Sequence, residues 1–589
     1  MSRNILVAVA WPYANAEIHV GNITGAYLPA DIFARYHRLR GNRVMMVSGS
    51  DAHGTPITVR ADAEGKSAQQ VYEHYHHRFL ELFQKTGLTY DLFTTTHSEN
   101  HFMVAQTIFS RLLENGYLYR KTEAQWYSPQ EGRFLPDRYV EGTCYLCGYE
   151  NARGDQCDGC GSMLDGTQLI KPRSKTGNLS LELRDTEHFF LDLAKLTPQL
   201  SAYLAADKEH WRPNVIKPSR YTVEETGLHG RAITRDLDWG IPVPLDGWEG
   251  KCLYVWFEAV IGYLSASIEW AKNRGTPAAW QDWWYDPEAR SYYFIGKDNI
   301  PFHAVIWPAE LAGVGRLFAD DSGERLNLPF DVPANEFMNL EGDKISGSRN
   351  WAVWGLDVVE RYGADAVRFY LTINMPESKD SDWAWAEFQQ RNNDELVATW
   401  GNLANRILSF AYKHFEERVP VPGELRAEDR QLLDAIADGF DSVGELLGAV
   451  KLRAALQEAL RLAGEVNKYL EEQAPWFSIK SDRAVAARSV YTALRAVDSL
   501  KIIFSPFIPF SSEQLHSYLG YDGKLFGEQD IESYRESERS HTALVYSDED
   551  ATGRWQPSEL EAGQALRPPA PLFRKLDESI VIEEMNRLG

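Results

Sequence analysis

Long apolar runs are missing from this sequence, and their absence excludes a class of protein. No apolar stretch approaches the ~18–20 residues that a membrane-spanning helix needs. The apolar run that begins at Ile5 ends at Pro12 without the small-residue cleavage pattern of a signal peptide, so it predicts a strand instead. We therefore expect a cytoplasmic protein with no membrane contact.

Cysteine and positive charge are also scarce. The chain has five cysteines in 589 residues, and four of them lie between Cys144 and Cys160. Such clustering is typical of a metal site in a reducing compartment rather than of a disulfide framework. The formal net charge of −23 argues against general affinity for nucleic acid. It neither requires nor excludes an RNA partner, because phosphate binding depends on local Lys and Arg.

Hydrophobic periodicity predicts two kinds of domain. A single core serves at most ~250–300 residues, so several domains are expected. A buried strand over 5–11, a helix over 24–39 and a second buried strand over 43–49 form the unit of a doubly wound parallel sheet. The same alternation returns after a turn-rich insertion, with apolar runs at 251–256 and 291–295 that predict strands, and a helix after Pro301. After Asp382 apolar residues repeat at three and four, which predicts an α-helical bundle.

The turn His19-Val20-Gly21-Asn22 follows the first predicted strand and opens the first predicted helix. Gly21 lets a ligand approach the backbone amides at a helix N-terminus, where phosphate is favoured. His19 and Asn22 can donate hydrogen bonds to phosphate oxygens. A plain strand-to-helix loop in which Asn22 caps the helix explains the turn equally well when it is taken alone.

A second polar loop, Gly342-Asp343-Lys344-Ile345-Ser346-Gly347-Ser348, occurs about 320 residues later. Lys344 can offset the charge that develops on a pyrophosphate leaving group, and small neighbours keep such a loop mobile. Between the two loops, Gly296-Lys297-Asp298 follows a predicted strand, where Asp298 can hold a ribose hydroxyl. The alternative is that the segments 19–22, 296–298 and 342–348 are ordinary surface turns. That alternative does not explain why all three occur in this order.

The two loops together resemble the His-x-Gly-His and Lys-Met-Ser-Lys-Ser signatures of class I aminoacyl-tRNA synthetases. Further segments narrow the resemblance to the methionyl-tRNA synthetase family and extend it over nearly the whole chain. These segments are 11–15, 50–56, 134–138, 254–259 with 262–263, 294–298 with 302–303, 402–406 and 472–476. Each is short, but their order and spacing are specific.

The resemblance implies a ligase that activates L-methionine with Mg²⁺-bound ATP and transfers it to the 3′ end of initiator and elongator tRNA(Met), for translation initiation and elongation. His19, Asn22 and Lys344 would be catalytic. The ATP site would comprise Tyr13, His19, Gly21, Asn22, Gly296, Asp298, Lys344, Ser346 and Ser348. Asp51 would hold the methionine ammonium, in a pocket lined by Ala10, Trp11, Tyr13, Trp256, Ala259, Tyr263 and His303. Aromatic walls suit a polarizable thioether, although ordinary core packing explains any single aromatic residue equally well.

Four cysteines form the pattern Cys144-x2-Cys147-x9-Cys157-x2-Cys160. Two such pairs suit a tetrahedral four-thiolate zinc knuckle, whereas a redox pair needs only one. Because four thiolates fill the coordination shell, this single zinc is expected to be structural. The resemblance places the knuckle in an insertion near the tRNA acceptor end.

In the helical region, Asn402, Arg406 and Trp476 match the positions with which the family reads the CAU anticodon. Base stacking on Trp and hydrogen bonds from Asn and Arg suit unpaired RNA. Helix packing and a solvated arginine are the alternatives without the family. The resemblance also favours a monomer, because no further oligonucleotide-binding module follows the bundle.

Two positions depart from the signatures. Asn22 stands where the first motif has its last His, and Gly347 stands where the second has its second Lys. Arg349 is a candidate to replace that missing cation. These departures leave open a non-catalytic, tRNA-binding paralogue. A synthetase for another aliphatic amino acid is disfavoured by the short insertion, and a small nucleotidyltransferase would need neither the bundle nor the zinc knuckle.

The expected fold class is α/β, a Rossmann-type doubly wound parallel sheet with a zinc-binding insertion, followed by an α-helical bundle. We place the two halves of the catalytic fold at 1–114 and 231–330. The insertion spans 115–230, with the knuckle at about 140–165. A region with the mobile loop and stem contacts follows at 331–390, the anticodon-binding bundle at 391–540 and an extended C-terminal tail at 541–589.

Overall fold

A seven-stranded sheet forms the centre of the molecule, and five of its strands are parallel. The computed structural model describes residues 2–154, 157, 159–160, 162, 164–175 and 180–588, with only the backbone at Ser348. The strand order is β14-β13-β1-β2-β3-β19-β18, and β14 to β3 pair in parallel. Their bounds are β14 Ala334–Asn335, β13 Arg290–Gly296, β1 Asn4–Val9, β2 Arg43–Ser50 and β3 Leu92–Thr95.

Both faces of the sheet are covered by helices. Alternate residues of β1 enter different cores: Ile5 and Val7 belong to one, whereas Leu6 and Ala8 belong to the other. The first core is closed by α2 (Leu28–Leu39) and α4 (Ala68–Thr86). The second is closed by α5 (Glu99–Glu114), α8 (Val255–Asn273) and α10 (Trp307–Val314). The expected doubly wound fold is therefore confirmed.

The first helix begins earlier than its sequence pattern indicated. The structure starts it at Val20, with α1 (Val20–Asn22), and a π-helical turn η1 (Ile23–Tyr27) joins α1 to α2. The apolar pattern misses this start because the first turn contains Gly21 and the exposed Asn22, which interrupt the apolar repeat. Gly41 ends the segment at a φ of 74°, as expected of a left-handed helix terminus.

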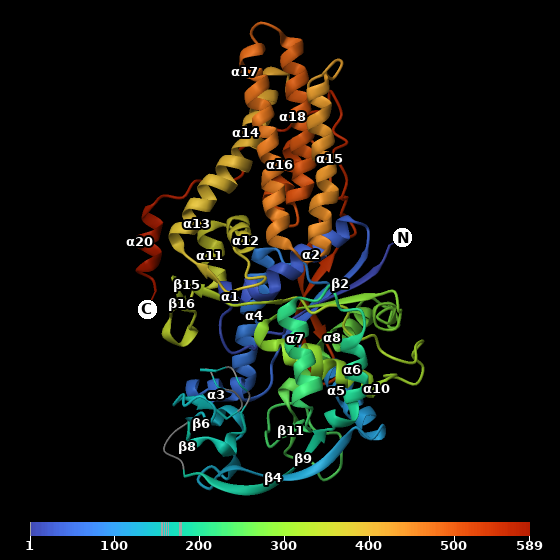
Figure 1. Cartoon of the computed structure of the whole chain (residues 1–589), viewed down its shortest axis with the longest axis vertical. Helices are drawn as coiled ribbons and strands as arrows, with labels where there is room; N and C mark the ends of the chain where they lie inside the picture. Colours follow the sequence, from blue (N-terminus) through green and yellow to red (C-terminus); the bar gives the residue numbers. More distant parts are fainter. Residues whose placement is uncertain are drawn as a thin grey trace.

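The insertion folds around an antiparallel sheet of its own. β4 (Leu118–Ser128) and β9 (Glu182–Leu191) are its long strands, flanked by β5 (Arg133–Phe134) and β10 (Arg231–Ala232). A smaller sheet of β6 (Val140–Thr143), β7 (Ala152–Arg153) and β8 (Ile170–Ser174) carries the cysteine segment. These sheets lie at the end of the molecule opposite the bundle (Figure 1). Helix α3 (Thr55–Glu64) packs beside the smaller sheet, whereas α6 (Leu193–Ala205) packs against α10 and α7 (Pro213–Tyr221) against α6.

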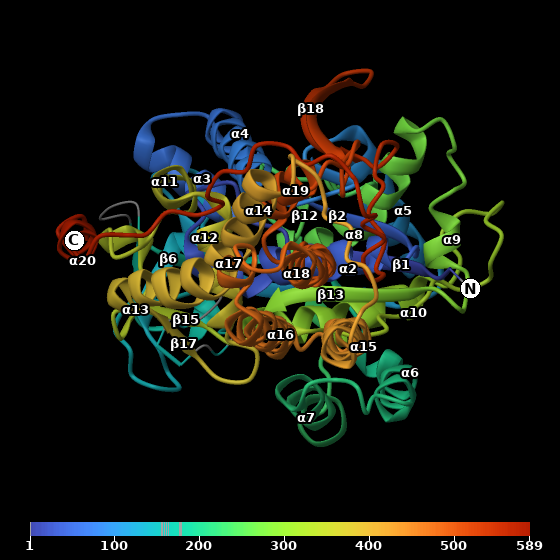
Figure 2. The ribbon, with the colours of Figure 1, turned by 90° about the horizontal axis from the view of Figure 1, so that it is seen from above.

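The C-terminal half is helical, as the periodicity predicted. Helices α11 (Gly355–Tyr362), α12 (Ala364–Ile373) and α13 (Trp385–Arg391), with the π-helical turn η8 (Asn392–Gly401), lead into the bundle. The bundle consists of α14 (Asn402–His414), α15 (Ala427–Gly448), α16 (Leu452–Gln473) and α18 (Arg483–Phe504), with short α17 (Pro475–Ser478) at its far end. Seen from above, α15, α16 and α18 stand nearly end-on over the central sheet (Figure 2).

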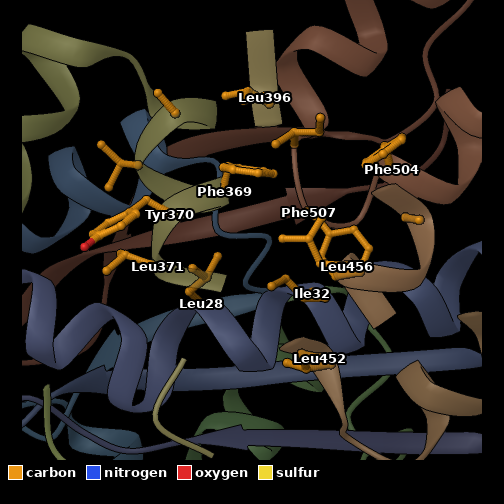
Figure 3. Packing of buried hydrophobic residues seen from close by; sticks show 14 of the residues in the cluster. Leu28, Ile32, Phe369, Tyr370, Leu371, Leu396, Leu452, Leu456, Phe504 and Phe507 are labelled. Atoms are coloured by element: carbon orange, nitrogen blue, oxygen red, sulfur yellow. The ribbon is translucent and has the colours of Figure 1, made fainter. Parts of the chain in front are cut away.

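One continuous apolar core joins the bundle to the catalytic sheet. Figure 3 shows Leu28 and Ile32 of α2 beside Phe369 of α12, Leu456 of α16 and Phe504 of α18. All five side chains are fully buried or nearly so. Close-packed cores have few voids and low compressibility. The bundle is therefore expected to move little relative to the sheet.

Two segments differ from the sequence predictions. Residues 251–256 were predicted as a strand, but only β12 (Cys252–Leu253) is extended and α8 begins at Val255. Instead of an extended tail from residue 541, β19 (Ser540–Ser547) pairs with β3 and with β18 (Glu528–Arg535). Short α19 (Pro509–Tyr518) precedes this hairpin and α20 (Ser579–Met585) lies near the C-terminus. The hairpin was missed because at least half of each strand is polar, and its attachment to β3 leaves no local signal because the paired residues lie more than 400 positions apart.

Among the described residues, no helix is both long and apolar enough to cross a membrane.

Candidate active site

The turn from His19 to Asn22 lies at the carboxyl end of β1. The backbone N–H of His19 donates to Oδ1 of Asn22 at 3.1 Å, so Asn22 does cap the turn, and its side chain remains exposed. Burial lowers the pKa of His19 to about 4, which keeps the imidazole neutral at pH 7. Its Nδ1 atom is buried without a hydrogen-bond partner among the described residues. A buried ring nitrogen of this kind is suited to a ligand.

The second polar loop lies directly against this turn. His19 pairs with Trp354 in an isolated β-bridge, and the N–H of Val20 donates to the carbonyl of Val353 at 3.0 Å. A Cβ atom on Gly21 would lie 3.0 Å from the His19 ring and 3.1 Å from Cδ1 of Ile345. The structure therefore brings together two segments that lie more than 300 residues apart in the chain.

Within that loop, Lys344 belongs to β16 (Asp343–Lys344), which pairs with β15 (Met338–Leu340), and its side chain is exposed. The N–H of Ser346 donates to the carbonyl of Trp351 at 2.8 Å, which closes the loop. Gly347 and Arg349 lie in a 3₁₀ turn and are exposed. The side chain of Ser348 lies outside the part of the chain that the structure describes.

Asp298 follows β13, on the neighbouring side of β1. A Cβ atom on Gly296 would lie 2.8 Å from Oδ1 of Asp298, so the glycine lets this carboxylate fold back over the strand end. The Asp298 side chain reaches solvent, yet surrounding protein atoms raise the pKa of its carboxyl group, and Lys297 and Lys344 lower it in part. Lys297 itself binds Glu336 at 2.8 Å and Asp380 at 2.7 Å.

Asp51 ends β2 and is buried at 3% exposure. Its backbone pairs with Tyr13, which brings the segment after β1 beside it. Burial first, and then the charge of Glu258, raises the pKa of Asp51 well above its ordinary value, whereas Arg138 lowers it. The N–H of His53 donates to Oδ1 of Asp51 at 3.4 Å. An ammonium group next to this carboxylate would favour its ionised form.

Aromatic side chains from three elements converge beside Asp51. The ring of Trp11 lies 6.4 Å from that of Tyr263, and the ring of Tyr13 lies 5.8 Å from that of Trp256, both edge to face. The Tyr263 hydroxyl contacts Nε2 of His303 at 2.7 Å. Two of the predicted pocket residues have no ring. Ala10 follows β1 directly, next to Trp11, and Ala259 lies on α8 with Trp256 and Tyr263.

The Tyr263–His303 pair has a defined hydrogen-bond direction. Nδ1 of His303 lies 2.9 Å from the carbonyl of Asn299 and must therefore carry the proton. Burial lowers the pKa of His303 to about 4, so the ring is neutral. Nε2 then accepts from the Tyr263 hydroxyl, and the tyrosine oxygen keeps lone pairs for other contacts.

Two glycines make room for Trp11. A Cβ atom on Gly49 would lie 2.1 Å from the indole ring, and one on Gly262 would lie 2.5 Å from it. Either clash would expel the ring, so both positions require glycine while Trp11 keeps its place. The indole Nε1 is buried without a hydrogen-bond partner among the described residues.

A buried polar array lies behind Asp51, and its residues were not predicted as part of the site. Glu258 accepts from Nδ1 of His53 at 2.8 Å and from Nε2 of His101 at 2.8 Å. Nε2 of His53 also contacts Nδ1 of His97 at 3.0 Å. His53 and Glu258 occur inside segments that carry the family resemblance, but nothing in the sequence indicates that they meet.

The four clustered cysteines converge as their spacing predicted. The Sγ atoms of Cys144, Cys147, Cys157 and Cys160 all lie within 4.8 Å of one another. In a tetrahedral zinc site with ~2.3 Å bonds, sulfur atoms lie ~3.8 Å apart. Backbone N–H groups of Leu146 and Gly159 point at sulfur, 3.4 Å from Cys144 and 3.3 Å from Cys157. These donors stabilise thiolates, so the residues present fit a zinc ion.

The three predicted anticodon positions meet on the outer surface of the bundle. Asn402 and Arg406 lie one turn apart on α14, and both are exposed. The Arg406 guanidinium lies 5.0 Å from the centre of the Trp476 ring and donates to Oδ1 of Asn467 at 3.3 Å. Ala474, with a φ of 41°, turns the chain so that α17 presents Trp476 to α14.

Comparison with known proteins gives matches over the whole chain. Residues 5–408 match the family model of tRNA synthetases class I (M), and residues 419–546 match that of the anticodon binding domain of methionyl tRNA ligase. The chain is 56% identical to a methionine–tRNA ligase of Thermomicrobium roseum over 590 residues, covering 100% of this chain and 99% of that protein. It is also 56% identical to the one of Roseiflexus sp. strain RS-1 over 597 residues, with the same coverage.

A solved structure gives a similar result. The Mycobacterium tuberculosis methionyl-tRNA synthetase in complex with methionyl-adenylate superposes with a TM-score of 0.74 at 25% identity, covering 97% of this chain and 100% of that chain.

Proposed function

This chain belongs to the class I tRNA synthetases of the methionine type, and from that premise we propose that it activates L-methionine with ATP and charges tRNA(Met). The reaction has two steps. The methionine carboxylate attacks the α-phosphate of ATP, giving methionyl-adenylate and pyrophosphate. The 3′-terminal ribose of the tRNA then takes the methionyl group. The observation that carries the proposal, beyond the family, is the contact between the His19 turn and the loop of Lys344.

On the nucleotide side, His19 and Asn22 donate hydrogen bonds to the phosphates, and Gly21 gives the backbone room to approach them. Lys344 with Ser346 and Ser348 binds the pyrophosphate as its charge develops. Asp298 holds the ribose hydroxyls, Gly296 admits the nucleoside, and Tyr13 closes the site. Positioning and electrostatic stabilisation suffice for such a transfer, with no side-chain nucleophile. Mg²⁺ enters with ATP and neutralises phosphate charge.

On the amino-acid side, Asp51 binds the ammonium group and the aromatic residues enclose the thioether. The buried position of Asp51 and the neutral state of His303 support this assignment. Tyr263 donates to His303, so its oxygen presents lone pairs rather than a proton to the pocket. The residues proposed to line it are Ala10, Trp11, Tyr13, Trp256, Ala259, Tyr263 and His303.

The remaining sites serve the RNA. The four cysteines hold one structural zinc in the insertion, which lies near the acceptor end of the tRNA. Trp476 stacks on an anticodon base while Asn402 and Arg406 hydrogen-bond to base edges. We propose a cytoplasmic monomer that charges both initiator and elongator tRNA(Met), for translation initiation and elongation.

ATP–pyrophosphate exchange with the purified chain tests the first step, measured separately with each of the twenty amino acids. We expect exchange with methionine well above that with leucine, isoleucine or valine. Exchange with one of these and not with methionine would contradict the specificity. Tight binding of tRNA(Met) without exchange for any amino acid would instead favour the non-catalytic paralogue that Asn22 and Gly347 leave open.

A further inference from the structure

The C-terminal hairpin inserts an arginine behind the methionine pocket. β18 and β19 extend the central sheet beyond β3, so the loop between them, residues 536–539, lies where β3 passes into α5. Nη1 of Arg539 lies 2.8 Å from Nε2 and 3.1 Å from Nδ1 of His97. The guanidinium also packs 4.1 Å from the centre of the Phe102 ring.

The loop is held in place by an exchange of carboxylates. Glu536 accepts from the N–H groups of Glu99 at 2.8 Å and Asn100 at 3.0 Å, at the N-terminus of α5. Glu99 in turn accepts from backbone N–H groups of the loop, among them that of Arg539 at 3.0 Å. Because both partners are fixed in this way, the position of Arg539 is defined by the sheet and by α5.

From Arg539 the contacts run inward to the pocket. Nδ1 of His97 faces Nε2 of His53 at 3.0 Å, and Nδ1 of His53 faces Glu258 at 2.8 Å. Glu258 is fully buried on α8, the helix that also carries Trp256 and Tyr263. The N–H of His53 reaches Asp51. Each link is a short contact between groups that are at least half-buried.

The carboxylate at the inner end fixes the direction of the whole array. An ionised Glu258 can only accept, so Nδ1 of His53 donates to it and Nε2 of His53 accepts from Nδ1 of His97. The single proton of a neutral His97 therefore lies on Nδ1, and its Nε2 accepts from Arg539 at the shorter of the two distances, 2.8 Å. Burial, His53 and Arg539 together lower the pKa of His97 to about 2, in agreement with a neutral ring.

We propose that Arg539 is a positioning residue for methionine: it supplies the donor for Nε2 of His97, which stabilises His97 and His53 as Nδ1–H tautomers and so keeps the Glu258 carboxylate paired behind Asp51. The inference rests on the proposed methionine activation. Without Arg539, His97 is free to take the Nε2–H form, which leaves its Nδ1 as an acceptor facing His53. His53 then turns its own proton toward His97, and Glu258 loses a donor. A buried carboxylate with one partner fewer is costly and disturbs Asp51.

Arg539→Met tests this in the full chain, with Arg535→Met as the matched control, since Arg535 is an exposed residue of the same hairpin. In methionine-dependent pyrophosphate exchange we expect the KM for methionine to rise about tenfold in Arg539→Met, in keeping with the loss of one hydrogen bond to a charged group. The KM for ATP should stay within about twofold, and Arg539→Lys should restore most of the methionine affinity. Arg535→Met should behave as the wild type.

Equal methionine KM values in the two Met variants would overturn the proposal, and so would a parallel rise in the KM for ATP. ¹⁵N-histidine spectra of the wild type give an independent answer that needs no variant. His97 and His53 should show protonated Nδ1, and a protonated Nε2 on either ring refutes the assignment even if Arg539→Met fails to fold. Absence of exchange in the wild type would contradict the proposed function instead.

Discussion

Asp51 is buried, yet its carboxylate must be ionised to bind the ammonium group of methionine. The rate of methionine activation should therefore depend on pH. The pKa of Asp51 is raised well above the ordinary value by burial and by Glu258. Because the ammonium of methionine binds the ionised form, kcat/KM for methionine should fall as the pH decreases through this raised pKa. Asp51→Asn should remove that acidic limb and lower kcat/KM about 10- to 100-fold at neutral pH. Pyrophosphate-exchange profiles of both proteins are the measurement. An acidic limb that persists in Asp51→Asn belongs to another group.

Gly347 stands where the family signature has its second lysine, so the loop 342–348 lacks that positive charge. Arg349, two residues further on, is exposed. If Arg349 supplies the missing charge, Arg349→Ala should slow adenylate formation at least tenfold, toward the ~10²–10³ typical of one lost stabilising donor. The same substitution should cost much less in a Gly347→Lys background. A Cβ at residue 347 would lie 3.0 Å from the Trp354 ring, so only a small shift of that ring is needed. Single-turnover rates of the four proteins settle this, and strictly additive effects would argue against compensation.

At the residue scale, the sequence predicted those groups of site residues that lie within one turn of each other in the chain. His19 and Asn22 share one turn, and Asn402 and Arg406 share one helix face, so spacing predicted that each pair lies together, and the family resemblance supplied the expected roles. Glu258 and His97 carry no such local signal, because their roles arise only where α8 meets the end of β3. The sequence could not predict that meeting, which depends on the order of strands in the sheet.

At the scale of elements, the cysteine segment 144–160 predicts metal binding, because its four thiolates are a complete set of zinc ligands. Four sulfur atoms within 4.8 Å of one another could hold one metal ion, and four thiolates suit zinc. Cys157→Ser should therefore abolish stoichiometric zinc, measured by elemental analysis. Because the cysteine segment is proposed to lie near the acceptor end of the tRNA, tRNA charging should fall about tenfold or more while pyrophosphate exchange changes by no more than about threefold. Cys252→Ser is the control, since Cys252 contacts the Leu237 carbonyl instead. An equal loss of zinc in both variants would contradict the assignment.

Among the elements, those with a strong local period were predicted and those made by distant pairing were not. Helices α15, α16 and α18 repeat apolar residues at three and four, and the structure forms all of them. The strands β18 and β19 have half-polar sequences, and the hairpin that they form joins the central sheet only through the pairing of β19 with the distant β3. Residues 251–256 show a related error: the apolar run continues from a two-residue strand into the buried start of α8, and periodicity does not separate these two states.

At the scale of the whole molecule, one arginine ties the bundle to the catalytic fold. Arg368 of α12 donates to Asp31 at 2.7 Å, to the carbonyl of Thr86 at 3.1 Å, and to those of Pro506 at 2.8 Å and Phe507 at 2.9 Å. All these contacts are buried, and they join α2, the end of α4 and the turn after α18. Together with the shared core in Figure 3, they make the bundle a rigid support for the distant anticodon surface.

That rigid separation predicts that anticodon contacts and amino-acid activation respond independently. Trp476 belongs to α17, which lies at the far end of the bundle from the sheet (Figure 1), and the Arg406 guanidinium lies over its ring. A base stacked on an aromatic ring contributes ~1–3 kcal/mol, so Trp476→Ala should lower kcat/KM for tRNA(Met) about 10- to 100-fold. Methionine-dependent pyrophosphate exchange should stay within about twofold, because α17 and the catalytic sheet lie at opposite ends of the bundle helices (Figure 1). Trp476→Phe, which keeps a ring for stacking, should recover most of the charging. If exchange fell together with charging in Trp476→Ala, the bundle would be coupled to the chemistry and not merely its support.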